Sequence, residues 1–240
     1  MLVRFKMAKE GLARFLSHLD TVRVVERALR RAGLPVAYSQ GFNPHPRISF
    51  GPALAVGIAS SGEYFDVEFD SRVDVELAAE VLERQMPRGF SIKGFGGVPT
   101  GAASLGSIIQ LAGYTVQCPY SVENRVPVFK LLVQDFLEKS EINVSRTTKK
   151  GMRVKDIRQG IHSLTVDQRE GTAVFSMVIE TGPTGSIKPR EVLQAFSEAY
   201  SLQLETDGAY VRRTDLLIPA YGGYVTPLDV LGQFGERTVQ

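Results

Sequence analysis

Cysteine and histidine are scarce in this sequence: its 240 residues include one cysteine, Cys118, and three histidines. A single cysteine excludes a disulfide framework within the chain, and it excludes zinc and iron–sulfur sites that need several thiolates. No pair among the histidines, the cysteine and the scattered carboxylates has the spacing of metal ligands. We therefore expect no metal site and no bound cofactor.

Long apolar runs are also missing. No stretch approaches the ~20 apolar residues that a membrane-spanning helix requires, and the N-terminal MLVRFKMAKEG carries charge where a signal peptide would be apolar. The glycine-rich stretch 94–101 is not followed by GK[ST], which argues against a phosphate-binding loop. With 43% hydrophobic and 22% charged residues, we expect a soluble, cytoplasmic globular protein with no membrane contact.

The net charge is only +2, but its distribution along the chain is uneven. Residues 1–50 hold nine Lys and Arg against three Asp and Glu, whereas residues 51–90 hold three against eight. Residues 146–158 hold six basic residues and one acidic residue. Clustered positive charge is typical of surfaces that bind polyanions, although a solvated loop or helix face gives the same pattern.

Hydrophobic periodicity predicts the same order of elements twice, β-α-β-β-α-β, which is the ferredoxin-like order. In the first half we expect strands at 2–7, 63–69 and 90–95, extended segments between 35 and 58, and helices at 17–33 and after Asp74. In the second half we expect strands at 113–118, 173–180 and 210–218, extended segments at 142–147 and 161–166, and helices at 125–139 and 189–200. The prediction is an α+β fold of tandem ferredoxin-like (βαββαβ) units with antiparallel sheets, RAMP-like in arrangement. A single larger α+β domain is the alternative.

The expected domain boundaries follow from this repeat. Residues 1–97 form the first unit, and residues 98–111 form a linker within a stretch rich in Gly, Pro and Ser. Residues 112–218 form the second unit, and residues 219–240 form a tail that mixes aromatic residues with Gly and Pro. The tail is either a strap packed across a domain or a segment that binds a partner.

The segment from Ser17 to Gly33 predicts a helix with two distinct faces. An apolar stripe that should face the sheet comprises His18, Val22, Val25, Leu29 and Ala32. A separate arc of about 100° carries four arginines, which are Arg23, Arg27, Arg30 and Arg31. Glu26 lies between the two faces and cannot neutralise the arginine row, so we predict that this row binds anions.

The first residues of this helix combine a structural signal with a possible catalytic group. Ser17 and Asp20 have the spacing of a capping box, in which each side chain bonds the other's backbone N–H. His18 is either a core histidine or a group that projects past the sheet edge into a cleft. In the second case the helix N-terminus would favour its neutral form, which suits a general base.

The loop GFNPHPR, residues 41–47, restricts its own backbone through Pro44 and Pro46. Phe42 offers a face for stacking, and Asn43, His45 and Arg47 offer polar groups for a phosphate or a base edge. The alternative is a rigid connector with Phe42 packed inside. A second group of cations would extend the basic track: Lys149, Lys150, Arg153, Lys155 and Arg158.

The stretch FLSHLDTVRVVERALRRAGLPVAYSQGFNPHPRISF, residues 15–50, closely resembles a bacterial family of radical SAM-linked proteins that is a domain of unknown function. KDIR, residues 155–158, is similar to a second family feature. Members of this family are fused to, or encoded beside, a cobalamin-binding radical SAM enzyme, often near genes for ribosomal proteins and ribonucleases. Because one cysteine cannot hold a radical SAM cluster, the resemblance implies that the radical chemistry happens on a separate polypeptide.

Two ferredoxin-like units with a histidine at the start of the first helix are also similar to the CRISPR repeat-processing endoribonucleases. In those enzymes a histidine at that place helps to cleave RNA without metal, and His18 is the matching position. Such enzymes have a glycine-rich loop near the C-terminal end of the sequence, and this sequence has no equivalent of it.

Three functions are consistent with these observations. The first is a non-catalytic RNA-binding or substrate-presenting accessory protein, which works with a separate radical SAM enzyme on RNA or a ribosomal component. The second is a metal-independent endoribonuclease in which His18 removes the 2′-hydroxyl proton. The third is a protein–protein adaptor whose arginine row binds an acidic patch on the enzyme.

Overall fold

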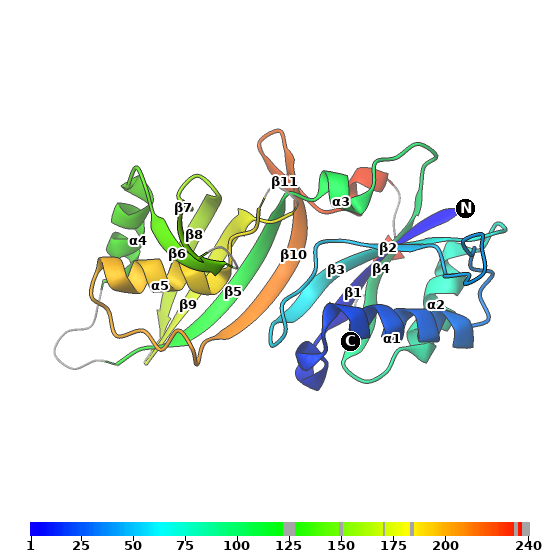
Figure 1. Ribbon diagram of the computed structural model, residues 1–240, viewed down its shortest axis with the longest axis horizontal. Helices are drawn as coiled ribbons and strands as arrows, with labels where there is room; N and C mark the ends of the chain where they lie inside the picture. Colours follow the sequence, from blue (N-terminus) through cyan, green and yellow to red (C-terminus); the bar gives the residue numbers. More distant parts are fainter. Residues whose placement is uncertain (122–127, 149–150, 170, 183–184, 233–234, 237–240) are drawn as a thin grey trace. The chain divides into compact units, whose positions relative to one another are not determined.

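Antiparallel strands and a few helices make up both halves of the chain, which confirms the α+β class expected from the sequence (Figure 1). This computed structural model describes residues 1–121, 128–148, 151–169, 171–182, 185–232 and 235–236. The chain forms two units, one of residues 1–110 with 213–240 and the other of residues 111–212. Among the described residues, none of the helices has both the length and the hydropathy needed to span a bilayer.

The first unit follows the predicted βαββαβ order with short additions. Its N-terminal part contains β1 (Leu2–Lys9), the 3-10 helix η1 (Gly11–Phe15), α1 (His18–Arg31), β2 (Ile48–Phe50), β3 (Ala59–Glu68), α2 (Val75–Gln85), β4 (Phe90–Val98) and α3 (Leu105–Ile108). Its C-terminal part contains β10 (Tyr210–Ala220) from Arg213 onward, β11 (Gly223–Val225), η2 (Asp229–Leu231) and β12 (Gly235–Glu236). The strand order is β12-β4-β1-β3-β10, with β2 pairing β3 and β11 pairing β10.

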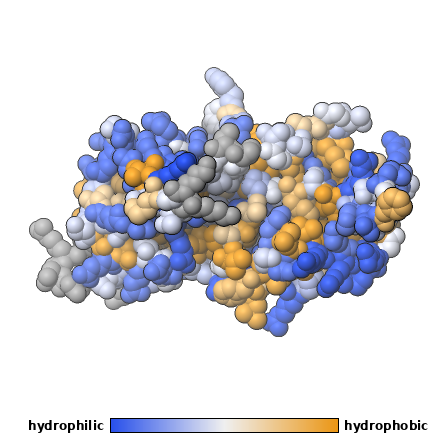
Figure 2. Space-filling model, viewed as in Figure 1, coloured by the Kyte–Doolittle hydropathy of each residue, from blue (hydrophilic) through white to orange (hydrophobic). Residues whose placement is uncertain are grey.

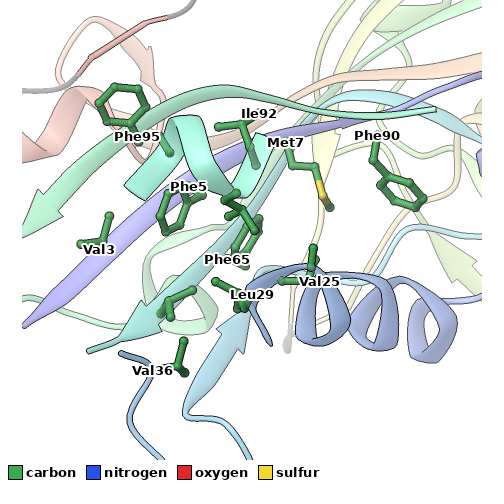
Figure 3. Close-up of a cluster of buried hydrophobic side chains, with 14 of the residues drawn as sticks. Val3, Phe5, Met7, Val25, Leu29, Val36, Phe65, Phe90, Ile92 and Phe95 are labelled. Atoms are coloured by element: carbon green, nitrogen blue, oxygen red, sulfur yellow. The ribbon is translucent and has the colours of Figure 1, made fainter. Parts of the chain in front are cut away.

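Helices α1 and α2 lie on one face of this sheet because alternate residues of β1 and β3 are apolar on that side. Figure 2 shows mostly hydrophilic atoms over the region where α1 lies, so the helix buries one side and exposes the other. In the core, the rings of Phe5 and Phe65 stack with centroids 5.2 Å apart, and Val25 and Leu29 of α1 pack nearby (Figure 3). The apolar stripe predicted for this helix therefore points inward at Val25 and Leu29.

The opposite face of the same sheet carries a buried ion pair. Arg4, which is 1% exposed, donates from Nε and Nη2 to the two carboxylate oxygens of Asp66 at 2.8 and 2.9 Å. Its Nη1 also donates to the carbonyl oxygen of Pro227 at 3.0 Å, and Leu228 beside it is buried. Part of the C-terminal segment, whose role the sequence left open, is thus fastened to the first unit.

The second unit repeats the order with one insertion. It contains β5 (Leu111–Pro119), α4 (Phe129–Glu138), β6 (Asn143–Thr148), β7 (Gly151–Asp156), β8 (Ile161–Arg169), β9 (Thr172–Glu180), α5 (Pro189–Ala199) and the first residues of β10. Its antiparallel sheet has the order β5-β9-β8. Edge-to-face contacts join the rings of Phe129, Phe136, Phe175 and Phe196 in its core.

The insertion is the hairpin β6–β7, which forms a two-stranded sheet of its own. The extended segment predicted at 142–147 corresponds to β6, whereas no strand was predicted at 151–156, so β7 was missed. Met152 and Val154 are exposed and the residues around them are polar or basic, so the hairpin has no alternation of buried and solvent-facing residues to reveal it. Residues 125–127, where the helix predicted at 125–139 was expected to begin, lie outside the described residues.

Candidate functional site

The N-terminus of α1 is closed by side chains of the helix itself. Ser17 Oγ accepts a hydrogen bond from the Asp20 N–H at 3.2 Å, and the Asp20 carboxylate accepts from the Ser17 N–H at 3.3 Å and its hydroxyl at 2.6 Å. These bonds from Ser17 lower the pKa of Asp20. The structure therefore contains the predicted capping box, which fixes where the helix begins.

The arginine row of α1 is exposed along its whole length, at Arg23, Arg27, Arg30 and Arg31. Arg23 pairs with Asp20 at 3.4 Å, in an exposed geometry that contributes little to stability. Arg31 donates to the carbonyl oxygen of Gln85 at 2.7 Å. In the part of the chain that the structure describes, no carboxylate lies within 4 Å of Arg27 or Arg30, so both guanidiniums face solvent without a counter-ion.

The loop after α1 is held closed by backbone hydrogen bonds. Ser39 donates to the carbonyl oxygen of His45 at 2.9 Å, and Arg47 donates to that of Ala37 at 2.8 Å. The base of the loop is joined to β3, because the Glu68 carbonyl oxygen accepts from Ala37 at 2.8 Å and the Glu68 N–H donates to Arg47 at 3.0 Å. The loop therefore has a fixed base at the end of β3.

The tip of this loop presents its side chains to solvent. Phe42 has a relative exposure of 104%, and Asn43 and His45 are exposed as well. Arg47 is exposed and its guanidinium lies 3.0 Å from the Glu68 carboxylate. The alternative in which Phe42 packs inside is therefore wrong. Figure 1 shows the loop beyond the C-terminal end of α1.

The second basic segment is less available for binding. Arg158 donates to the carbonyl oxygens of Leu137 and Ile161 within its own unit. Lys155 is half-buried, and Arg153 is exposed on β7. Lys149 and Lys150 lie outside the described residues.

His18 is neither a fully buried core histidine nor a fully exposed side chain, the two arrangements that the sequence suggested. Its side chain is half-buried, and its ring meets Phe50 edge-on with centroids 5.7 Å apart. It lines a cavity of about 10 Å³ together with Lys9, Thr21 and Glu63. A cavity of that volume has room for about one water molecule.

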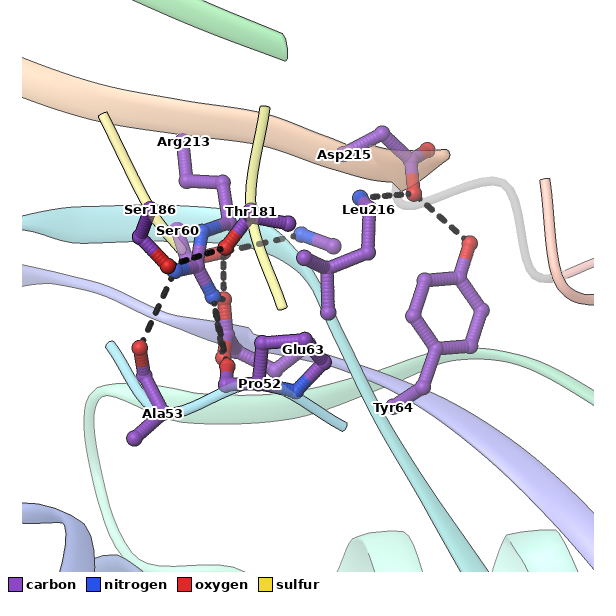
Figure 4. Close-up of polar contacts among 11 residues, drawn as sticks. Pro52, Ala53, Ser60, Glu63, Tyr64, Thr181, Ser186, Arg213, Asp215 and Leu216 are labelled. Carbon is purple, nitrogen blue, oxygen red and sulfur yellow. Dashed lines mark hydrogen bonds and ion pairs between the residues drawn. The ribbon is translucent and has the colours of Figure 1, made fainter. Parts of the chain in front are cut away.

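A polar network that sequence reasoning missed lies next to this cavity. Lys9 is 1% exposed and donates to the carbonyl oxygen of Leu16 at 2.6 Å. Buried Arg213 donates from Nη1 to both Glu63 carboxylate oxygens, at 3.0 and 3.1 Å, and from Nη2 to the Ala53 carbonyl oxygen at 3.1 Å (Figure 4). Burial lowers the pKa of Lys9, and the Glu63 carboxylate opposes this effect.

A second polar group lies on the other face of the sheet. Lys6 contacts the Asp215 carboxylate at 2.6 Å, and the Tyr64 hydroxyl donates to the same carboxylate at 2.7 Å. Burial raises the pKa of Asp215, and Lys6 opposes the rise. Burial also raises the pKa of Tyr64 above its ordinary value. Within the residues that the structure covers, no three His, Cys, Asp or Glu side chains are grouped as metal ligands.

Comparison with known proteins places the chain in a family. The family model described as "Uncharacterized protein conserved in bacteria (DUF2344)" matches residues 3–189. The chain belongs to this family. The bacterial family of unknown function expected from the sequence is thereby confirmed, and its link to radical SAM enzymes stays a prediction. A comparison with curated proteins found no match.

Two solved structures contain chains that are similar to this one. One is "Crystal Structure of a Cbf5-Nop10-Gar1 Complex", with a TM-score of 0.48 and 12% identity over 88% of this chain and 48% of that chain. The other is "Crystal structure of the archaeal box H/ACA sRNP Nop10-Cbf5 complex", with a TM-score of 0.47 and 11% identity over 89% of this chain and 47% of that chain. The chain spans about half the length of each of these two chains.

The buried amine of Lys9 predicts a pH dependence of stability. Because burial lowers the pKa of Lys9 in the folded state below its ordinary value of 10.5, the unfolded chain binds more protons between those two pKa values. The free energy of unfolding should therefore rise with pH in that interval. Urea unfolding at pH values up to about 10.5 should show a smaller rise for the Lys9→Met variant than for the unchanged protein. A Lys93→Met control should follow the unchanged protein, and parallel curves for all three proteins would contradict the assignment.

Proposed function

We propose that this protein is a non-catalytic RNA-binding accessory protein, which presents RNA or an RNA-containing ribosomal component to a separate enzyme. The observation that carries the proposal is Phe42, fully exposed at the tip of a restrained loop, with uncompensated arginines on the preceding helix. An aromatic ring in that position is available to stack on an unpaired base.

The loop geometry supports this use of Phe42. Pro44 and Pro46 restrict the backbone, and the bonds to Glu68 close the loop at its base. A loop that is already ordered loses little conformational entropy when a base stacks on it. Asn43 and His45, exposed on the same loop, supply polar groups for the edge of a base or for the sugar.

The arginine row supports contact with a phosphate backbone. Arg23 and Arg30 are seven residues apart, which is about 10 Å along the helix axis. Arg27 lies between them, so the row can follow several successive phosphates of a strand. Arg47 would add a further contact from the loop. On the second unit, exposed Arg153 is a separate candidate for contact with RNA.

The proposed enzyme partner comes from the sequence resemblance alone. Members of the radical SAM-linked family accompany a cobalamin-binding radical SAM enzyme, and this chain has one cysteine, Cys118, which is buried. The radical chemistry would therefore take place on the separate enzyme, and the present protein would hold the substrate.

A metal-independent endoribonuclease is the second candidate, and the partial exposure of His18 at the start of α1 favours it. Half-buried His18 lines a small cavity there together with Lys9 and Glu63. An imidazole can remove the 2′-hydroxyl proton, and a neighbouring cation can stabilise the charge that develops on the phosphate.

Replacement of Arg27 and Arg30 by Gln should weaken RNA binding in a salt-dependent way. Fluorescence anisotropy with a labelled single-stranded RNA should give a log–log salt slope that is less negative by about 1.4 in the double variant, since each lost phosphate contact changes it by about 0.7. Exposed Arg84 and Arg88 of the same unit, changed together to Gln, provide the control with the same net charge. Equal slopes for both double variants would contradict the arginine row as the phosphate surface and favour the adaptor.

Replacement of Phe42 by Ala should weaken binding of the same RNA by roughly 5- to 150-fold, because stacking of one base contributes about 1–3 kcal/mol. The salt slope should stay unchanged, since no phosphate contact is lost. Tyr221 has a relative exposure of 109% on the β10–β11 hairpin of the same unit and is the matched aromatic control. A Tyr221→Ala variant that loses as much affinity as Phe42→Ala would argue against a specific role for the loop.

The nuclease candidate predicts cleavage of labelled RNA in EDTA that disappears in a His18→Ala variant. The accessory-protein proposal predicts intact RNA with both proteins. Cleavage by the unchanged protein that depends on His18 would replace the first proposal by the second. Cleavage that persists in His18→Ala would contradict a catalytic role for His18.

A further inference from the structure

A groove of about 570 Å³ opens next to the base of the 41–47 loop, at the end of β1 and β3 in the first unit. Its lining includes Leu2, Glu68, Arg72, Val98, Thr100 and Gly101. Binding sites for small organic groups in proteins have volumes of about 300–1,000 Å³. The groove is therefore large enough for a nucleoside.

Glu68 joins this groove to the proposed RNA surface. Its backbone N–H and carbonyl oxygen hold Arg47 and Ala37 at the two ends of the loop, while its side chain lines the groove. One carboxylate oxygen, Oε1, lies 3.0 Å from the Arg47 guanidinium. The side chain is 40% exposed, and among the described residues it forms no second ion pair.

The lining of the groove provides an apolar wall, a hydrogen-bond acceptor and a cation, which are the groups that bind a nucleotide. Leu2 and Val98 give an apolar wall for a base face, and the carboxylate of Glu68 can accept from an exocyclic amino group. Arg72 is exposed and supplies a cation for the adjoining phosphate. At Gly101, where φ is +83°, no atom lies within 4 Å of the position that a Cβ would take, so this part of the rim is open.

We infer that this groove is a base-recognition site in which Glu68 selects cytosine over uracil. The inference rests on the RNA-binding function proposed above and names the specificity of that surface. The two pyrimidines have the same size and differ at position 4, where cytosine carries an amino donor and uracil a carbonyl acceptor. The Glu68 carboxylate accepts from the amino group and repels the carbonyl oxygen. Arg47, paired with the other carboxylate oxygen, orients Glu68 and remains close to the backbone of the bound strand.

Fluorescence anisotropy with two labelled RNAs, decacytidylate and decauridylate, tests the inference. The unchanged protein should bind decacytidylate about 5- to 10-fold more tightly, as expected for one base-specific hydrogen bond of modest strength. In the Glu68→Gln variant the ratio of the two affinities should fall to about 1, because an amide can donate to uracil as well as accept from cytosine. The ratio of the two affinities is the quantity to compare, because loss of a negative charge should strengthen the binding of both RNAs to the same extent.

Two further variants separate the possible results. Glu76→Gln removes an exposed carboxylate from α2 of the same unit and should keep the ratio of the unchanged protein. The Arg72→Gln variant should bind both RNAs more weakly, by the same factor. Unchanged affinity in that variant would contradict the claim that the groove is part of the RNA-binding surface. Equal binding of both RNAs by the unchanged protein, or a preference that survives in Glu68→Gln, would overturn the inference while leaving RNA binding intact. Failure to bind either RNA would overturn the proposed function itself.

Discussion

The pairing of Glu68 with both ends of the 37–47 segment is the constraint on which the candidate site depends. Its N–H and carbonyl oxygen fix Arg47 and Ala37, so a loop with a fully exposed aromatic tip leaves the sheet at a defined place. An exposed ring on a freely moving loop would lose entropy each time it bound a base. Ordering the loop in advance removes part of that cost, and the prolines inside the loop act in the same direction.

The charged side chains of the first unit form two groups, one buried in ion pairs and one exposed to solvent. Inside, Arg4 with Asp66 and Arg213 with Glu63 form pairs whose hydrogen bonds are satisfied, so these charges hold strands together and are closed to ligands. Outside, the arginines of α1 lie on the exposed face of a helix whose other face fills the core. The small cavity beside His18 is lined by Lys9, Glu63 and Phe50 among others, and so lies on the buried side of this division.

Much of the first unit could be predicted because its signals are local. The capping box and the four-arginine arc follow from spacing within one helix, and the βαββαβ order follows from periodicity. Lys9 was missed because the predicted strand ended at Met7, although Val3, Phe5, Met7 and Lys9 continue one inward-facing alternation. The Arg213–Glu63 pair joins residues 150 positions apart, so no local pattern could indicate it. The groove at Glu68 likewise brings together the ends of separate strands, and no local motif distinguishes Glu68 from other carboxylates of the chain.

The central claim is that the 37–47 loop and the α1 arginines receive an unpaired stretch of RNA. Ultraviolet cross-linking of a single-stranded RNA to the full chain, followed by tryptic digestion and mass spectrometry, tests it most directly. The account predicts that the cross-linked nucleotide is attached to the peptide 32–47, at Phe42. A cross-link confined to the peptide that carries Tyr221, or to the second unit, would contradict it.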